Sequence, residues 1–107
     1  MMVPKLLIEW CETMFEPRQN PLAGHSAYGM KHIFQKDTGE YVTEEVFTEA
    51  MIRCGYNSVM TNGMPYLFCV SKKSEAFDWR ARRGLPTGWY MNPDLTEVFQ
   101  QERGKRK

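Results

Sequence analysis

No run of apolar residues in this sequence is long enough to cross a bilayer, and the common catalytic motifs are missing. The chain has no glycine-rich phosphate loop, no G-x-S-x-G nucleophile elbow and no H-E-x-x-H zinc motif. Its N-terminal stretch lacks the unbroken apolar core and the small-residue cleavage site of a secretory signal. We therefore expect a cytoplasmic protein that is not an enzyme, does not enter a membrane, and uses no cofactor or small-molecule substrate.

Cysteine and histidine are scarce, with three and two residues respectively. Cys11, Cys54 and Cys69 are far apart, each lies in an apolar run, and none belongs to a C-x-x-C pair. A structural zinc site needs more ligands at closer spacing than His25 and His32 can supply. We expect no metal site and three buried free thiols, which act as small hydrophobic side chains.

A strong excess of one charge is also missing, because the net charge is only +1. That value hides an asymmetry. Residues 1–71 contain five basic and eight acidic residues, whereas residues 72–107 contain nine basic and five acidic residues. Such polarity suits a molecule that meets a charged partner with one end. An uneven distribution that arose by chance is the alternative.

What is present is the composition of one small globular domain. The 107 residues are 42% hydrophobic and 13% aromatic, which is enough apolar material for a single core. No repeat or convincing linker divides the chain. We expect a single domain over residues 1–107, with an N-terminal helix in 1–16, a helix–helix–hairpin segment in 26–71 and a basic C-terminal segment in 72–107.

Apolar residues at helical spacing predict three helices in the first half of the chain. The first begins at Pro4, the second is capped by Ser26, and the third runs from a cap at Thr43 to a stop at Gly55. The expected buried stripes are Leu7, Trp10, Cys11 and Met14 in the first helix, Ala27, Met30, Ile33 and Phe34 in the second, and Val46, Phe47, Ala50, Met51 and Cys54 in the third.

The segment NSVMTNGMPYLFCVS predicts a β-hairpin, because Asn62 and Gly63 tolerate the positive φ of a two-residue turn. In the expected register Val59 lies opposite Tyr66, and Phe68 faces the core.

Two shorter helices are expected in the last third. Ser74 can cap one that ends at Gly84, and Asn92 can cap another that begins at Pro93. The expected apolar stripe of the last helix is Leu95, Val98 and Phe99.

The run HSAYGMKH, followed by GEYVTEEVFTEAMIRCGY, resembles small uncharacterised proteins of bacterial phages and integrative elements. The order helix, helix, hairpin from Ser26 to Ser71 also resembles a winged helix-turn-helix. The resemblance covers about His25 to Val70. It implies an α+β, winged-helix-like fold with extra N-terminal and C-terminal helices. Its motifs are core positions and caps, so no functional residue is carried over from it.

The outward side of the third predicted helix is acidic, whereas a DNA-reading helix must approach phosphates that carboxylates repel. We therefore favour docking on a basic protein surface. An inhibitor of a host defence nuclease, similar to an anti-CRISPR protein, is one concrete form. A winged-helix transcriptional regulator that binds DNA is the alternative. The expected outward residues are Glu44, Glu45, Thr48, Glu49, Ile52 and Arg53.

The stretch FDWRARRGLPTGWYM interleaves aromatic residues with arginines, which are enriched at binding hot spots and also stack on unpaired bases. The alternative is that the aromatic side chains belong to the core and the arginines to its solvated rim. The candidates for protein binding are therefore Glu44, Glu45, Glu49, Trp79, Trp89 and Tyr90. If the chain binds nucleic acid instead, the candidates are Arg80, Arg82, Arg83, Lys105, Arg106 and Lys107.

Overall fold

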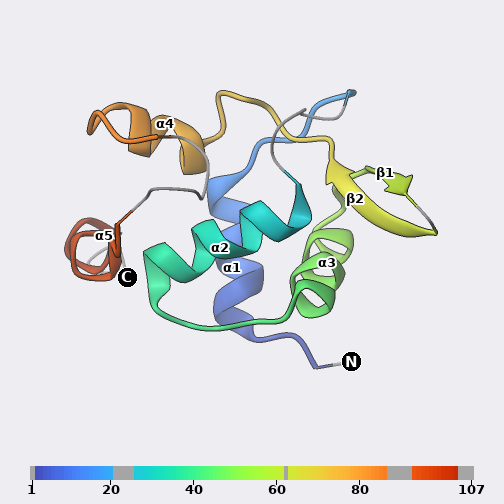
Figure 1. The fold of residues 1–107 in the computed structure, drawn as a ribbon, viewed down its shortest axis with the longest axis horizontal. Coiled ribbons are helices and arrows are strands. Elements are labelled where there is room, and N and C mark those ends of the chain that lie inside the picture. The colour runs from blue at the N-terminus through green and yellow to red at the C-terminus, as the bar shows by residue number, and fades with distance from the viewer. Residues whose placement is uncertain (1, 21–25, 62, 87–92, 104–107) are drawn as a thin grey trace.

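The structure is a computed structural model that describes residues 2–20, 26–61, 63–86 and 93–103. Within these ranges the chain forms five helices and one antiparallel two-stranded sheet, which confirms the α+β class (Figure 1). None of these helices is long and apolar enough to span a membrane. In chain order the elements are α1 (Lys5–Met14), α2 (Ala27–Thr38), α3 (Glu44–Arg53), β1 (Ser58–Thr61), β2 (Met64–Phe68), α4 (Glu75–Ala81) and α5 (Thr96–Arg103).

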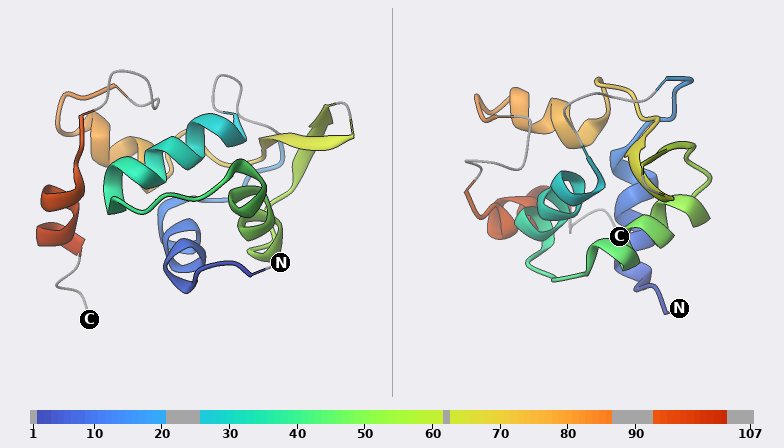
Figure 2. Two further views of the ribbon diagram at one scale, coloured as in Figure 1. Left: turned by 60° about the horizontal axis from the view of Figure 1, so that its bottom comes forward. Right: turned by 45° about the vertical axis from the view of Figure 1, so that its right-hand side comes forward.

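The helices α1, α2 and α3 form the centre of the molecule, with the hairpin at one end and α4 and α5 at the other (Figure 1). α3 packs on both α1 and α2, α2 also contacts β2 and α5, and α4 contacts α1. Two further views show that the hairpin projects from the helical body and that α5 lies beside the C-terminal end of α2 (Figure 2). The acidic helix α3 is therefore close to the hairpin and far from α5.

The ends of α2 and α3 follow the capping residues predicted from the sequence. Ser26 Oγ accepts a hydrogen bond from the Gly29 N–H (3.2 Å), and Thr43 Oγ1 accepts one from the Val46 N–H (3.1 Å). Gly55 follows α3 with a φ of 91°, which confirms the left-handed stop expected there. These caps fix where the two helices begin and so which of their faces is buried.

The predicted apolar stripes are buried, with differences at the edges of α3. Thr48, expected on the outward side, is buried, because α3 packs against two helices and needs a wider buried face than one stripe. Val46 and Cys54 lie at the edges of that face and are only half-buried. In α2 two charged residues, Lys31 and Asp37, are buried although the sequence analysis did not single them out.

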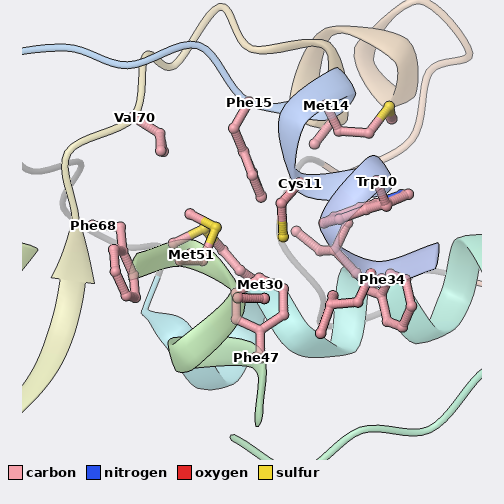
Figure 3. Packing of buried hydrophobic residues seen from close by; sticks show 14 of the residues in the cluster. Trp10, Cys11, Met14, Phe15, Met30, Phe34, Phe47, Met51, Phe68 and Val70 are labelled. Atoms are coloured by element: carbon pink, nitrogen blue, oxygen red, sulfur yellow. The ribbon is translucent and has the colours of Figure 1, made fainter. Parts of the chain in front are cut away.

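Aromatic side chains from several elements meet in the core. Trp10 makes edge contacts with Phe34 and Phe47, whose ring centroids lie 5.3 Å and 6.4 Å from its own. Figure 3 shows Met51 and Phe68 closing the same cluster from α3 and β2. This cluster joins the hairpin to the three central helices, so the hairpin is anchored by Phe68 as expected.

β1 and β2 form the predicted hairpin, but the register differs from the prediction. Val59 lies opposite Leu67, because an irregularity between Val59 and Met60 leaves Tyr66 without an opposite residue. Pro65, which lies opposite Met60, has no N–H to donate to the ladder. The predicted register assumed regular pairing up to the turn and therefore did not include this interruption.

The last third of the chain departs further from the prediction. Ser74 precedes α4, but its Oγ accepts a hydrogen bond from the Glu16 N–H (2.8 Å) and makes no cap bond. α5 begins at Thr96 and not at Pro93. The reason is that Asp94 Oδ1 accepts the Thr96 N–H (2.9 Å) and so caps the helix later in the chain.

The buried side of α5 is narrower than predicted. Leu95 is buried and Phe99 packs against the core, but Val98 is exposed because α5 packs mainly on α2. Asn92, the predicted cap, and Asn62, the first residue of the predicted turn, lie outside the described residues.

Candidate functional site

The outward side of α3 carries the three glutamates that the sequence analysis singled out. Glu45 is exposed, while Glu44 and Glu49 are half-buried. Phe47, fully buried on the opposite side, fixes this orientation. The surface that we call the acidic face consists of Glu44, Glu45, Glu49, Ile52 and Arg53.

Part of the charge on the acidic face is compensated within the chain. Glu49 Oε2 accepts a hydrogen bond from Arg53 Nε (2.9 Å), in an exposed pair of the kind that contributes little to stability. Burial lowers the pKa of Lys31, and the Glu44 carboxylate acts against that shift. In the part of the chain that the structure describes, Glu45 forms no ion pair. Glu45 is therefore the least compensated of the three glutamates.

Exposed apolar side chains lie at the same end of the molecule as the acidic face. Ile52 in α3 and Val59 and Met60 in β1 are 47%, 41% and 56% exposed. Figure 1 shows α3 and the hairpin as neighbours at this end. The sequence predicts a strand at Val59 and Met60 but does not show which of these side chains are exposed. Two apolar residues in a strand that directly follows an acidic helix were the feature of the sequence that could have indicated an exposed apolar surface.

Arg80, a candidate for nucleic-acid contacts, has no exposed surface. Its Nη2 donates to Asp37 Oδ1 (2.5 Å), and its Nη1 donates to the Ala76 carbonyl (3.0 Å). Trp10 Nε1 donates to the other carboxylate oxygen of Asp37 (3.1 Å). A guanidinium held in this way does not reach a phosphate, so we remove Arg80 from the nucleic-acid candidates.

Arg82 and Arg83 stay at the surface, but both are held in ion pairs. Arg82 Nη2 lies 3.0 Å from Glu75 Oε2, and Arg82 Nη1 pairs with Asp78. Arg83 pairs with Glu102 of α5. Phosphate contacts by either arginine would have to compete with these carboxylates.

Trp79, a candidate for protein binding, is buried between α4 and α5. Its ring packs edge-on against Phe99, with centroids 5.7 Å apart, and its Nε1 donates to Glu102 Oε1 (3.0 Å). The guanidinium of Arg83 lies 4.7 Å from the centroid of the Trp79 ring. These contacts match the alternative in which the aromatic residues belong to the core, and we remove Trp79 from the binding candidates.

The remaining candidates lie outside the described residues, and their roles stay predictions. They are Trp89, Tyr90, Lys105, Arg106 and Lys107. His25, considered as a possible metal ligand, also lies outside.

The three thiols are unbridged, as predicted. Cys11 and Cys69 are buried, while Cys54 is half-buried. Burial raises the pKa of both Cys11 and Cys54, and the Glu12 carboxylate adds to the rise. The Tyr56 hydroxyl lies 3.0 Å from the Cys11 carbonyl oxygen, and burial raises its pKa to about 12. The raised pKa values of Cys11 and Cys54 are the opposite of what activates a thiol as a nucleophile.

The outer side of α2 carries an aromatic and basic cluster that the sequence analysis missed. Lys31 Nζ donates to Gln35 Oε1 (2.9 Å) and lies 5.6 Å and 4.9 Å from the ring centroids of Tyr28 and Tyr41. The half-buried ring of His32 packs edge-on against Tyr28, with centroids 4.5 Å apart. Burial lowers the pKa of His32, and Lys31 adds to that shift. The signal in the sequence was the spacing of Tyr28, Lys31, His32 and Gln35 on one side of a helix.

Two hollows adjoin this cluster and meet at Asp94. The first, about 370 Å³, is lined by His32, Gln35, Lys36, Gly39, Tyr41 and Asp94. The second, about 510 Å³, is lined by Asp94, Thr96, Glu97, Gln100 and Gln101. Within the described ranges, no group of three or more His, Cys, Asp or Glu side chains is placed to hold a metal ion.

Comparison of the chain with protein-family models, with characterised proteins and with solved structures gives no match.

Proposed function

We propose that this chain is a non-enzymatic, cytoplasmic binding protein that docks the acidic face of α3 on a basic surface of another protein. One contrast supports the proposal. Arg80, Arg82 and Arg83, the described arginines considered for nucleic-acid contacts, are held in ion pairs within the chain, whereas Glu45 is exposed at the end of the molecule that also presents apolar side chains.

In such a complex the charged and the apolar residues have different tasks. Carboxylates attract a basic surface over a distance and so speed association. Ile52, Val59 and Met60 supply contact area that loses water in the complex and so slows dissociation. We expect the partner to carry lysines or arginines around an apolar depression.

An inhibitor of a host defence nuclease, similar in mode to an anti-CRISPR protein, is the concrete form that we propose. The resemblance of the segment from His25 to Val70 to phage and integrative-element proteins supports this form. The chemistry of the target supports it as well, because a nuclease must hold phosphates in a basic channel. An acidic face that enters such a channel competes with phosphates for the same cations.

A winged-helix regulator that binds DNA is the second candidate. The order α2, α3, hairpin favours it, since a winged helix-turn-helix has its wing after the recognition helix. In that arrangement α3 would approach phosphates with Glu44, Glu45 and Glu49, which repel them. We therefore rank this function second.

A pull-down from the native host, with and without nuclease treatment, tests the proposal. We expect a protein partner that survives nuclease treatment with the wild-type chain and is captured in smaller amount with a Glu45→Gln, Glu49→Gln variant. Glu97→Gln, which removes an exposed charge from α5, is the matched control and should retain the partner. Capture that disappears with nuclease, or that is unaffected by the α3 variant, would contradict the proposal.

A further inference from the structure

The loop between α2 and α3 places an exposed aromatic ring over a buried cation. Tyr41 is 70% exposed, and Lys31 Nζ lies 4.9 Å from the centroid of its ring. Lys31 itself is only 6% exposed, and its ammonium donates to Gln35 Oε1 (2.9 Å). The cation attracts the ring and restrains the loop, while most of the ring surface stays open to solvent.

The hollow of about 370 Å³ beside this ring has walls from two separate parts of the chain. The Leu95 N–H donates to the Lys36 carbonyl (2.8 Å), which ties the segment before α5 to the end of α2. A side chain at Gly39 would place its Cβ 3.4 Å from the side chain of Thr96, so the two segments approach closely here. The hollow is therefore part of the packed structure and not a gap between independent loops.

Besides the His32 imidazole and the Tyr41 hydroxyl, the hollow is lined by a carboxylate, an ammonium and an amide. Asp94 Oδ1 accepts hydrogen bonds from the Thr96 N–H (2.9 Å) and the Thr96 hydroxyl (2.5 Å), which hold the pKa of Asp94 below its usual range. Asp94 is therefore a fixed carboxylate that can only accept hydrogen bonds. Lys36 adds an ammonium, and Gln35 adds an amide. An open ring, a carboxylate acceptor and a cation thus surround one small space.

From this combination we infer that the hollow binds a nucleotide whose base carries an exocyclic amino group. The base stacks on Tyr41, its amino group donates to Asp94, and its phosphate accepts from Lys36. The volume lies in the range of small-ligand sites. A carboxylate in the hollow disfavours anions that bring no hydrogen-bond donor, so inorganic phosphate alone should bind weakly. This inference does not depend on the proposed docking of α3.

Isothermal titration calorimetry with four ligands tests the inference. AMP should bind most tightly. Purine riboside 5′-monophosphate lacks the exocyclic amino group and has no N–H on that edge of the base, so it should bind about tenfold more weakly because it offers Asp94 no donor. Adenosine lacks the phosphate, and ribose 5-phosphate lacks the base, so both should also bind more weakly. A short single-stranded oligoadenylate serves as a fifth ligand, and tighter binding than AMP would identify a nucleic-acid strand as the source of the nucleotide.

Two substitutions of Tyr41 and one of Lys36 provide matched variants. Tyr41→Ala should weaken AMP binding about tenfold or more, whereas Tyr41→Phe keeps the ring and should bind like the wild type. Lys36→Gln should weaken the binding of AMP but not that of adenosine. Glu9→Gln, which removes an exposed charge from α1, should leave AMP binding unchanged. Equal binding of AMP and purine riboside 5′-monophosphate, unchanged AMP binding in Tyr41→Ala, or no AMP binding at millimolar concentration would each overturn the inference.

Discussion

Arg80 and Asp37 are the residues whose roles were hardest to predict. Arg80 belongs to a run of three arginines whose other two members are exposed, and composition alone therefore placed it at the surface. Helical spacing indicates better than composition that Arg80 and Asp37 are buried. Arg80 follows the buried Ala76 by one turn of α4, and Asp37 follows the buried Ile33 by one turn of α2. Opposite charges at two buried positions indicate an ion pair, but only tertiary packing shows that these two helices meet.

The buried pair gives a prediction for stability. Arg80→Ala should destabilise the fold by about 3–5 kcal/mol, because the carboxylate of Asp37 would remain buried without its counter-charge. Replacing Arg80 by Met together with Asp37 by Leu should recover part of that loss, because no charge is then left unpaired although Trp10 Nε1 loses its acceptor. Arg82→Ala is the control and should have a small effect, since its ion pairs are exposed. Urea unfolding measures all three, and equal losses for Arg80→Ala and Arg82→Ala would contradict the assignment of a buried ion pair.

Phe47 gives a second prediction at the scale of one side chain. It is fully buried against Trp10, so Phe47→Ala should cost about 3–5 kcal/mol of unfolding free energy. Ile52→Ala, on the exposed side of the same helix, is the matched control and should change stability much less. A melting temperature that Phe47→Ala leaves unchanged would mean that α3 buries its other side.

The bounds of the central helices can be predicted from residues close to their ends, whereas the bounds and caps of α4 and α5 cannot. Thr43 and Gly55 bracket α3 because a cap and a stop act within a few residues of themselves. The Ser74 hydroxyl bonds instead to a backbone N–H 58 residues earlier in the chain, which no local rule can anticipate. The start of α5 was misplaced because Asp94 and Asn92 are both good caps and the sequence does not decide between them.

The hairpin turn gives a prediction at this scale. Gly63 has a φ of 79°, and no other group lies close to where its Cβ would be. Gly63→Val should therefore destabilise the hairpin through backbone strain of about 1–2 kcal/mol and not through a clash. Gly63→Asn should be tolerated better, because asparagine adopts positive φ more readily. Thermal unfolding compares the two variants, and equal stability of both with the wild type would show that the turn does not need this conformation.

For the molecule as a whole, part of the positive charge that the sequence places in residues 72–107 is engaged in ion pairs. The arginines of α4 and the residues that follow it are paired with carboxylates of α2, α4 and α5, so they add little free positive charge to that end. Pairing of this kind is a property of the packed structure, and counting charges along the chain overlooks it. On the acidic side, Glu45 is exposed and forms no ion pair among the described residues.

The central claim, that the acidic face of α3 meets a basic protein surface, is tested most directly by an association rate. The rate is measured by stopped-flow fluorescence for the captured protein partner, with wild type and with the Glu45→Gln, Glu49→Gln variant, at several salt concentrations. We predict that the variant associates several-fold more slowly at low salt and that high salt removes most of the difference, because complementary charges steer the encounter. An unchanged or faster association of the variant at low salt would contradict the claim.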